Sequence, residues 1–382
     1  MVPKVSSKFA RRLLPLGSNL IETSTKKPIV GNGATNLGNR CDTFTMLTYN
    51  MLSPYYMWPQ VYTYVPDKFK EWSYRHALLE KEILNKYRAD IMCVQELTWK
   101  DYDSFWQEHL EQDLNYGSSF IAKTPPKYWQ RPENEMDGVG IFYNREKFDH
   151  ISSTSIYLSD MIGIFNIKEL NYLKSTIITL TNGAGEPVGK ESLLNVLHSR
   201  NQVCLFVSLM HRKTKTLFVV INTHLYWKYD EVKLCQCLTI MRKLDRIIRQ
   251  LLMGIEGATY SKIKILFTGD LNSLPDSPVV NFLKGDVVSR ADFNLVNPLR
   301  PYLNRYIYQD TSENAFDYTC YSGKLKGIFD YIWYHDTDFR LKKVLTGIEV
   351  TEELKYLQQF GLPNEYHPSD HIPVLTEFEL LS

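Results

Sequence analysis

The chain has 382 residues, of which 44% are hydrophobic and 23% are charged, and its formal net charge is +1. This composition is typical of a globular protein and excludes the disordered, collagen-like and disulfide-scaffold classes. No apolar run approaches the roughly 18 residues that a membrane-spanning helix needs, so we expect no membrane partner. Because the charges nearly balance, any binding of nucleic acid has to come from a local patch or from a metal ion.

Residues 1–40 form a basic segment that differs in composition from the rest of the chain. Its acid-poor, arginine- and serine-bearing first 27 residues are typical of an organelle transit peptide and predict a mitochondrial location. The alternative is a basic disordered tail on a cytoplasmic protein, and Pro3 and Pro15 count against a regular amphipathic helix. A stretch rich in Gly, Asn and Thr at 31–39 predicts a linker, so we expect one domain over residues 41–382.

From residue 42 onward, short runs rich in Val, Ile, Phe and Tyr alternate with longer segments of helical periodicity. The expected strands are 44–50, 91–96, 138–143, 202–209, 216–223, 264–268, 329–334 and 372–378. The expected helices are 73–87, 101–114, 230–252 and 277–283. Residues 159–195 contain several glycines and are expected to form an irregular surface excursion. The pattern predicts one large α/β domain in which helices cover layered sheets.

The six cysteines form no CxxC pair, and no histidine stands at zinc-finger spacing from them. Several lie in apolar runs, where reduced thiols behave as small hydrophobic side chains. We therefore expect a reducing compartment and no zinc site.

Polar side chains stand at the ends of six apolar strands. These residues are Asn50, Glu96, Asn222 with His224, Asp270 with Asn272, Asp330, and Asp370 with His371. A strand end is a rigid platform for functional side chains, although each residue alone has an ordinary explanation, such as a turn residue that bonds its own backbone. Together they offer oxygen and imidazole ligands without thiolates, which suits Mg2+ or Mn2+ and favours hydrolysis of phosphate esters.

The same residues carry a resemblance to a known family. The ordered series is Asn50, Gln95-Glu96, Asn222-Thr223-His224, Gly269-Asp270-Leu271-Asn272-Ser273, Asp330-Tyr331-Ile332 and Ser369-Asp370-His371. Over about residues 44–380 it resembles the endonuclease/exonuclease/phosphatase superfamily. Residues 47–53, 72–75 and 232–234 resemble its branch of carbon-catabolite-repressor-type deadenylases, nocturnin and Angel. Residues 54–65 and 367–371 resemble the fungal NGL-type RNA exonucleases, in particular their mitochondrially associated member.

The resemblance implies a DNase-I-like fold, which is a four-layer α/β sandwich of two packed mixed β-sheets flanked by helices. It also implies hydrolysis of single-stranded RNA from the 3′ end, with Mg2+ as cofactor and Mn2+ as a substitute. Glu96 would be the main metal ligand, with Asn50 beside it and Asp370 as a further carboxylate near the metal. A metal lowers the pKa of bound water, and one positioned acid or base contributes about 10²–10⁴-fold to the rate.

The remaining matched residues would form the catalytic set. Asp270 would orient or deprotonate the attacking water or hold a second metal, and Asn272 and His224 would contact the scissile phosphate. His371 would act on the phosphate side with its ring oriented by Asp330. Asn222 belongs to the same set through its motif. The candidate substrate-binding residues are Arg75, Trp227, Tyr229, Asp317 and Tyr318.

Two departures from the deadenylase pattern concern the substrate. Trp227 is followed by Lys228 and Tyr229, where the deadenylases have Trp-Asp-Pro with a proline that stacks on adenine. Asp317-Tyr318-Thr319 stands where they have Asn-Tyr-Thr before a Phe, and a longer stretch, 320–325, follows. Stacking is worth about 1–3 kcal/mol per base, so losing one platform would remove a poly(A) preference and leave catalysis intact. Tyr229, Tyr318 and Tyr321 are the candidate replacements.

Basic and aromatic residues alternate in the loop 123–137, in a pattern suited to single-stranded RNA. A solvated proline-rich loop is the alternative. Two other functions compete with the exoribonuclease. One is a phosphatase of the same superfamily that acts on a nucleotide or lipid phosphate, and the other is a non-catalytic RNA-binding adaptor, against which the intact ligand set argues. We expect no obligate protein partner.

Overall fold

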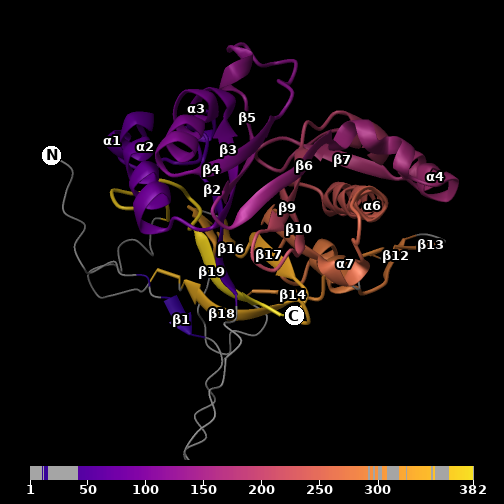
Figure 1. Ribbon diagram of the computed structural model, residues 1–382. Coiled ribbons are helices and arrows are strands. Elements are labelled where there is room, and N and C mark those ends of the chain that lie inside the picture. The colour runs from indigo at the N-terminus through magenta and orange to yellow at the C-terminus, as the bar shows by residue number, and fades with distance from the viewer. Residues whose placement is uncertain are drawn as a thin grey trace, which may run out of the picture.

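In the computed structural model, two β-sheets pack face to face, and helices cover both outer faces (Figure 1). The structure describes Arg11, residues 13–15 and residues 42–381, except 291–292, 296, 300–302, 308–317, 324, 346 and 349–360. The order of layers is helix, sheet, sheet, helix, which confirms the predicted four-layer sandwich.

Each sheet has one parallel pair at its centre and antiparallel neighbours on both sides. The first sheet runs β1 (Leu13–Pro15), β18 (Phe339–Leu345), β19 (Val374–Leu380), β2 (Thr43–Asn50), β3 (Ile91–Thr98), β5 (Asp137–Asn144) and β4 (Tyr116–Ala122). The second runs β14 (Arg305–Tyr306), β17 (Asp330–Tyr334), β11 (Ile263–Asp270), β10 (Leu217–His224), β9 (Val203–His211) and β6 (Phe148–Tyr157). The parallel pairs are β2 with β3 and β10 with β11. Because parallel strands end at the same edge, each pair brings two carboxyl ends together.

The outer layers pack on the sheets through apolar faces. The first sheet is covered by α1 (Asp67–Lys70), α2 (Trp72–Glu80), the π-helical η3 (Lys81–Lys86), α3 (Trp99–Asp101), η4 (Tyr102–Trp106) and η5 (His109–Asp113). The second is covered by α4 (Ile167–Ser175), α5 (Leu193–His198), α6 (Asp230–Gly254) and α7 (Pro278–Lys284). The remaining elements are η2 (Pro54–Tyr56), η6 (Glu133–Glu135), η7 (Leu158–Ile164), η8 (Tyr260–Lys262), and the strand pairs β7 (Ile177–Thr181) with β8 (Pro187–Ser192), β12 (Val288–Arg290) with β13 (Phe293–Leu295), and β15 (Cys320–Ser322) with β16 (Leu325–Gly327).

The core explains why the central strands are apolar throughout. In β2, Phe44 and Met46 point into the core between the sheets, whereas Leu47 and Tyr49 face the helices outside. A strand that is buried on both faces loses the alternation of polar and apolar residues that marks a half-exposed strand. The strands predicted from continuous apolar runs are therefore confirmed. Among the strands that were not predicted, β4 and β6 lie at sheet edges and carry the serine-rich sequences YGSSFIA and FDHISSTSIY.

The expectation of an irregular excursion at 159–195 is wrong. This segment contains most of η7, α4, the hairpin β7–β8 and the start of α5, and Leu173 and Leu193 are buried in the same core cluster as α6. Gly183, Gly185 and Gly189 lie in the hairpin and its turn. A signal for α4 was present in the sequence, because Asn166 and Glu169 form a capping box at its start.

Part of the basic N-terminal segment packs on the domain. β1 pairs with β18, and Arg11 is buried and donates from Nη2 to the Pro373 carbonyl at 2.7 Å. The rest of the predicted targeting and linker segment, including Cys41 at the domain boundary, lies outside the described residues. The five cysteines that the structure describes are buried free thiols. No helix among the described residues is long and apolar enough to span a membrane.

Candidate active site

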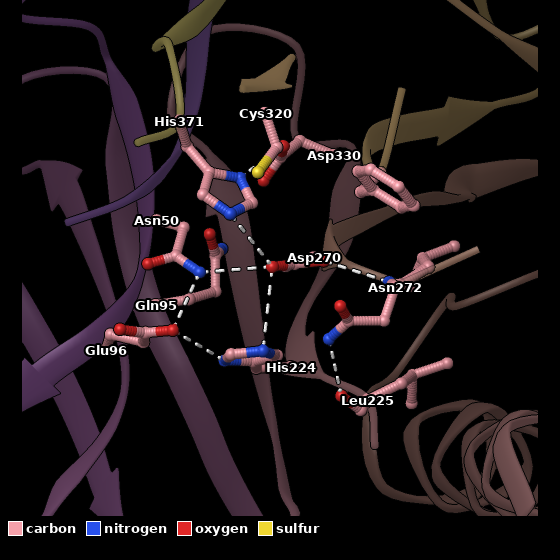
Figure 2. A network of polar contacts seen from close by, with 12 residues as sticks. Asn50, Gln95, Glu96, His224, Leu225, Asp270, Asn272, Cys320, Asp330 and His371 are labelled. Atoms are coloured by element: carbon pink, nitrogen blue, oxygen red, sulfur yellow. Dashed lines mark hydrogen bonds and ion pairs between the residues drawn. The ribbon is translucent and has the colours of Figure 1, made fainter. Parts of the chain in front are cut away.

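The two parallel pairs deliver the predicted polar residues to one place. In β2 and β3, Asn50 is in register with Gln95, one residue before Glu96. In β10 and β11, His224 is in register with Asp270. The antiparallel strand β17 begins at the same point, with Asp330 opposite Asp270. Strand ends from both sheets therefore surround one polar network (Figure 2).

Asn50 joins the two sheets at this point. Its Nδ2 donates to Glu96 Oε1 at 3.1 Å and to Asp270 Oδ2 at 3.0 Å. One amide thereby fixes the separation of two carboxylates that come from different sheets. The Glu96 carboxylate also accepts from the Ser53 backbone N–H at 2.8 Å.

Glu96 occupies a strained backbone position. Its φ is +57°, and the register of β3 against β5 shifts between Gln95 and Leu97. Such a bulge redirects one side chain out of the regular ladder, and positive φ in a non-glycine residue is typical of functional sites. Burial raises the pKa of Glu96 to about 7, with a further contribution from Asp137.

Asp270 is held on both sides. Oδ1 accepts from the Asn272 backbone N–H at 2.9 Å, while Oδ2 receives the Asn50 amide. Burial, followed by the neighbouring Asp330, raises the pKa of Asp270 to about 6. The preceding Gly269 has φ +135°, and a Cβ there would lie 1.9 Å from the Thr223 carbonyl oxygen, so this close approach of β11 to β10 requires glycine.

The pKa values of the two histidines of the network are shifted in opposite directions. Burial alone would lower the pKa of His371, but Asp330, Cys320, Asp270 and Asp370 together raise it well above its usual value. Its Nδ1 lies 2.7 Å from Asp330 Oδ2, and its Nε2 lies 3.6 Å from Asp270 Oδ2. Burial, with Lys123 and His371 nearby, lowers the pKa of His224 well below its usual value. At neutral pH, one imidazole is therefore cationic and the other neutral.

His224 lies between the two carboxylates on the side opposite His371 (Figure 2). Its Nδ1 is 3.8 Å from Glu96 Oε1, and its Nε2 is 3.5 Å from Asp270 Oδ2. Asn272 has φ +46°, and its Nδ2 donates to the Leu225 carbonyl at 2.9 Å. Its predicted contact with a phosphate stays a prediction.

The polar network fits a divalent cation. The raised pKa values of Glu96 and Asp270 show that buried negative charge is incompletely compensated. Within the described residues, Asp330 Oδ1, Asp370 Oδ1 and His224 Nδ1 are buried without a hydrogen-bond partner. The ligand atoms of Asp270, Asp330 and His371 lie within 4.8 Å of one another. Glu96, the predicted main ligand, stands outside that group and is connected to it through Asn50.

Asn222 does not belong to the catalytic set. It is fully buried, and its Nδ2 donates to the Val94 carbonyl at 2.9 Å and to the Gly140 carbonyl at 2.8 Å. Its Oδ1 accepts from Gln95 Nε2 at 2.7 Å. All three partners lie on the opposite sheet, so Asn222 ties the sheets together beneath the site and cannot reach a substrate.

Arg75 is also corrected, from substrate binding to positioning. Its side chain is 0% exposed, and Nη1 donates to the Leu52 carbonyl at 2.8 Å and to the Pro368 carbonyl at 3.0 Å. Those two carbonyls lie near Asn50 and Asp370 in the chain. The guanidinium therefore fixes the loops that carry these two residues and is covered from solvent.

Four further residues were not assigned to the site from the sequence. Lys123 is buried and paired with Asp137 at 2.6 Å, and the Tyr56 hydroxyl donates to the other Asp137 oxygen at 2.6 Å. The Tyr62 hydroxyl donates to Asp370 Oδ2 at 2.8 Å. Lys123 therefore does not track an RNA strand as the loop pattern predicts. Its position at the end of β4, where it meets the start of β5, is visible only in the fold.

The other candidate substrate residues lie at the surface or are partly covered. Trp227 is 60% exposed, whereas Tyr318 is largely buried against Tyr321, with Lys326 over both rings. Tyr229 is half-buried, and its hydroxyl accepts from the Thr181 backbone N–H at 3.1 Å. Asp317 lies outside the described residues. The role of these four residues in binding stays a prediction.

Comparison with known proteins agrees with the arrangement. Residues 47–371 match the model of the Endonuclease/Exonuclease/phosphatase family. The chain is 61% identical over 358 residues to "RNA exonuclease NGL1" of Saccharomyces cerevisiae, which covers 93% of this chain and 98% of that protein. It is 28% identical over 352 residues to the "CCR4-Not complex 3'-5'-exoribonuclease subunit Ccr4" of Candida albicans, which covers 89% of this chain and 41% of that protein.

Solved structures show the same fold at lower sequence identity. The structure of ANGEL2, described as a 2',3'-cyclic phosphatase in complex with adenosine-2',3'-vanadate, matches with a TM-score of 0.65 and 21% identity over 88% of this chain and 96% of that chain. The human nocturnin catalytic domain with a bound sulfate anion matches with a TM-score of 0.55 and 19% identity, over 88% of this chain and 94% of that chain. The ordered motifs, the fold and the sequence matches lead to one conclusion: the chain belongs to the endonuclease/exonuclease/phosphatase family.

Proposed function

We propose that this protein is a Mg2+-dependent 3′–5′ exoribonuclease that acts on single-stranded RNA. The observation that carries the proposal is the buried network in which Asn50 holds Glu96 and Asp270 together, with His371 and Asp330 beside them. The names of the two relatives, an RNA exonuclease and a 3′–5′ exoribonuclease, support RNA as substrate and the 3′ end as the point of attack.

Glu96, Asn50 and Asp370 are the residues that would hold the metal. When bound, Mg2+ would neutralise charge on the phosphate oxygens and lower the pKa of a coordinated water. Oxygen ligands and a few retained waters are the coordination that Mg2+ prefers, and Mn2+ accepts the same ligands. The under-compensated charge of the buried carboxylates supports a cation of this kind.

The proposed reaction is attack of water on the last phosphodiester of the chain. Asp270 is fixed by two hydrogen bonds, so it presents Oδ2 as the acceptor for the proton of the attacking water. The new bond forms between the water oxygen and phosphorus, and the bond to the 3′ oxygen of the preceding nucleotide breaks. The products are a nucleoside 5′-monophosphate and an RNA shortened by one residue with a 3′ hydroxyl.

The two histidines have separate tasks in this proposal. Cationic His371, held by Asp330, donates from Nε2 to a non-bridging oxygen, where negative charge grows in the transition state. Neutral His224 donates or accepts a hydrogen bond on the opposite side without adding a second charge. The pair therefore binds phosphate with one fixed positive charge and one uncharged contact.

The flexible end of a single-stranded RNA is the substrate that suits this site best. Glu96, Asp270 and Asp330 are buried, so the scissile phosphate has to enter between the strand ends of the two sheets. A terminal nucleotide of single-stranded RNA can bend into such a site, whereas a duplex presents a stiff backbone. Exposed Trp227 is the proposed stacking face outside the site, and without the proline of the deadenylases we propose no strong preference for poly(A).

We also propose that the protein works in mitochondria, on the evidence of the basic, acid-poor N-terminal segment. Since β1 packs on the domain, we expect any processed form to retain Arg11 and residues 13–15. N-terminal sequencing of the protein from purified mitochondria tests both points. Absence from the organelle, or a mature N-terminus beyond residue 11, would contradict them.

The activity is tested with the purified full chain and 5′-end-labelled RNA in Mg2+. A ladder of products shortened one nucleotide at a time is expected, which EDTA abolishes and Asp270→Asn loses. RNA ending in a 2′,3′-cyclic phosphate is assayed in parallel, because processing of that end without shortening would assign the protein to the phosphatases of the family. No ladder from folded wild-type protein on homopolymeric or mixed RNA would overturn the proposal.

A further inference from the structure

A second group of possible metal ligands lies beside His371, and it contains a thiol. Cys320 Sγ lies 4.0 Å from Asp370 Oδ2, and the ligand atoms of Cys320, Asp370 and His371 all lie within 4.8 Å of one another. All three residues are buried. The spacing of the cysteines in the sequence predicted no zinc site. That spacing could not reveal this group, because Cys320 and Asp370 are 50 positions apart and only the fold brings them together.

Backbone contacts hold this group in place. Cys320 and His371 form an isolated antiparallel β-bridge, and the Tyr321 backbone N–H donates to the Asp370 carbonyl at 2.8 Å. The relative position of the three side chains therefore follows from paired backbone and does not depend on a mobile loop tip. A preformed arrangement lowers the cost of ordering the ligands around an ion.

Asp370 has one carboxylate oxygen that a cation beside Cys320 could take up. Its Oδ2 accepts from the Tyr62 hydroxyl at 2.8 Å, but Oδ1 is buried without a hydrogen-bond partner among the described residues. That free oxygen lies 4.0 Å from His371 Nε2. A buried carboxylate oxygen without a partner is costly, and a bound cation removes that cost.

We propose that Cys320, Asp370 and His371 form an inhibitory site for a thiophilic divalent ion such as Zn2+. Thiolate, imidazole and carboxylate are the ligands that zinc prefers, and three of them leave the fourth tetrahedral position for water. Mg2+ selects oxygen ligands and gains nothing from the sulfur. When the ion binds, the Cys320 thiol and the cationic His371 ring each release one proton to solvent, and the sulfur and an imidazole nitrogen form bonds to the metal, so the step needs no oxidant or reductant.

Inhibition follows from shared residues, and this part of the inference rests on the proposed function. His371 is proposed to stabilise the phosphate and Asp370 to lie near the catalytic Mg2+. An ion that takes both residues withdraws them from the reaction even when Mg2+ is abundant. The thiol thus allows the site to distinguish Zn2+ from Mg2+, although both ions carry the same charge.

Binding is tested with Cd2+ as the probe, because a Cd2+–thiolate bond gives an ultraviolet charge-transfer band. The full chain is titrated under reducing conditions free of competing thiols, and one band that saturates at one equivalent is expected. Cys320→Ser and Cys320→Ala, each checked for folding by circular dichroism, should lose the band. Cys41→Ser is the matched control and should keep it. No band in wild type, or an equal band in both Cys320 variants, would overturn the site.

Inhibition is measured separately as the Zn2+ concentration that halves RNA hydrolysis at fixed Mg2+. Even loss of a group behind a metal ligand costs 10- to 100-fold in affinity, so removing the thiolate should raise that concentration by about tenfold or more. An equal value in Cys320→Ser would overturn the inhibitory role. A Cd2+ band in a protein that cleaves no RNA would support the site while contradicting the proposed function, so the two failures are distinguishable.

Discussion

The buried polar network and the exposed aromatic surface of this protein differ in how they are held. The polar network, defined as Asn50, Glu96, His224, Asp270, Asp330 and His371, lies at strand ends and is cross-linked by hydrogen bonds and ion pairs. The aromatic surface, defined as Tyr55, Tyr128, Trp129 and Trp227, lies on loops and on the short helix η2, and Trp227 and Tyr128 in it are 60% and 82% exposed. The candidate catalytic residues are therefore fixed by the two sheets, whereas the proposed contacts with the nucleotide chain come from surface segments.

The aromatic surface is associated with cations. Arg131 lies 4.7 Å from the centre of the Tyr55 ring, which packs edge-on against Trp129. Lys228 lies 5.3 Å from the centre of the Trp227 ring. Exposed rings can stack on bases and neighbouring cations can contact phosphates, so this arrangement is suited to binding single-stranded RNA of any sequence. We therefore expect changes in the network to abolish turnover and changes in the aromatic surface to weaken binding.

The largest effect should come from Glu96→Gln. This change keeps the size of the side chain and removes the charge that would hold the metal, so kcat should fall by about 10³-fold or more. The measurement is single-turnover hydrolysis of labelled RNA. Glu108→Gln, at an exposed acid on the helical layer, is the matched control and should leave kcat unchanged. Near wild-type turnover in Glu96→Gln would mean that the network is not the catalytic centre.

A large effect on stability is expected from Asn222→Leu. The change leaves the Val94 and Gly140 carbonyls without the Asn222 amide from the other sheet, at about 1–3 kcal/mol for each buried group, and it removes one of the acceptors of the Gln95 amide. We expect the free energy of unfolding to fall by about 3 kcal/mol or more, as measured by urea denaturation. Asn201→Leu, at a residue whose amide bonds a loop carbonyl near the surface, is the control. If Asn222→Leu lost activity but kept full stability, Asn222 would return to the catalytic set.

Trp227→Ala should affect binding more than turnover. Removing one stacking ring should raise KM for RNA by roughly 5- to 100-fold, which corresponds to about 1–3 kcal/mol, and should change kcat much less. Steady-state kinetics on oligo(A) and oligo(U) measure both constants. Tyr260→Ala, at an exposed ring beyond the far end of α6, serves as comparison. A fall in kcat with KM unchanged would contradict the division between network and surface.

The last expected effect concerns the pH dependence of stability and arises behind the first sheet. Burial raises the pKa of Glu82 from 4.5 to about 7, although the Tyr49 hydroxyl donates to its carboxylate at 2.8 Å. Because the folded protein binds this proton more tightly than the unfolded chain, the contribution of Glu82 to stability is fully present below about pH 4.5 and is lost as the pH rises through 7.

Glu82→Gln removes that titration. Relative to the variant, wild-type protein should lose up to about 3 kcal/mol of unfolding free energy between pH 5 and 8. Urea denaturation at several pH values measures the difference, with exposed Glu71→Gln as control. Parallel pH profiles of wild type and Glu82→Gln would show that Glu82 does not titrate in this range.

The sequence predicted the network better than its surroundings, for physical reasons. A polar residue after a continuous apolar run has to lie at the end of a buried strand, and parallel pairing brings such ends together, so Asn50, Glu96, His224 and Asp270 could be placed. Asn222 lies on the same face of β10 as His224, but it is two residues farther from the end of the strand, where β3 and β5 cover it. The alternation of residues along a strand indicates which face a side chain lies on, but not how far from the end of the strand it lies.

Other features depend on contacts between distant segments. Arg75 bonds a carbonyl 293 positions away, and Lys123 meets its partner Asp137 only through the hairpin of β4 and β5. The bulge that turns Glu96 outward also has no local signature, since Glu is not a residue that favours positive φ. Burial and partnership of these residues could be known only from the fold.

In the proposed reaction, the network directs water to the phosphorus of the last phosphodiester. Hydrolysis in 18O-labelled water, followed by mass spectrometry of both products, distinguishes this route from attack at another atom. We expect a single 18O atom in the phosphate of the released nucleoside 5′-monophosphate and none in the 3′ hydroxyl of the shortened RNA. Label in the shortened RNA, or in inorganic phosphate released without shortening, would contradict it.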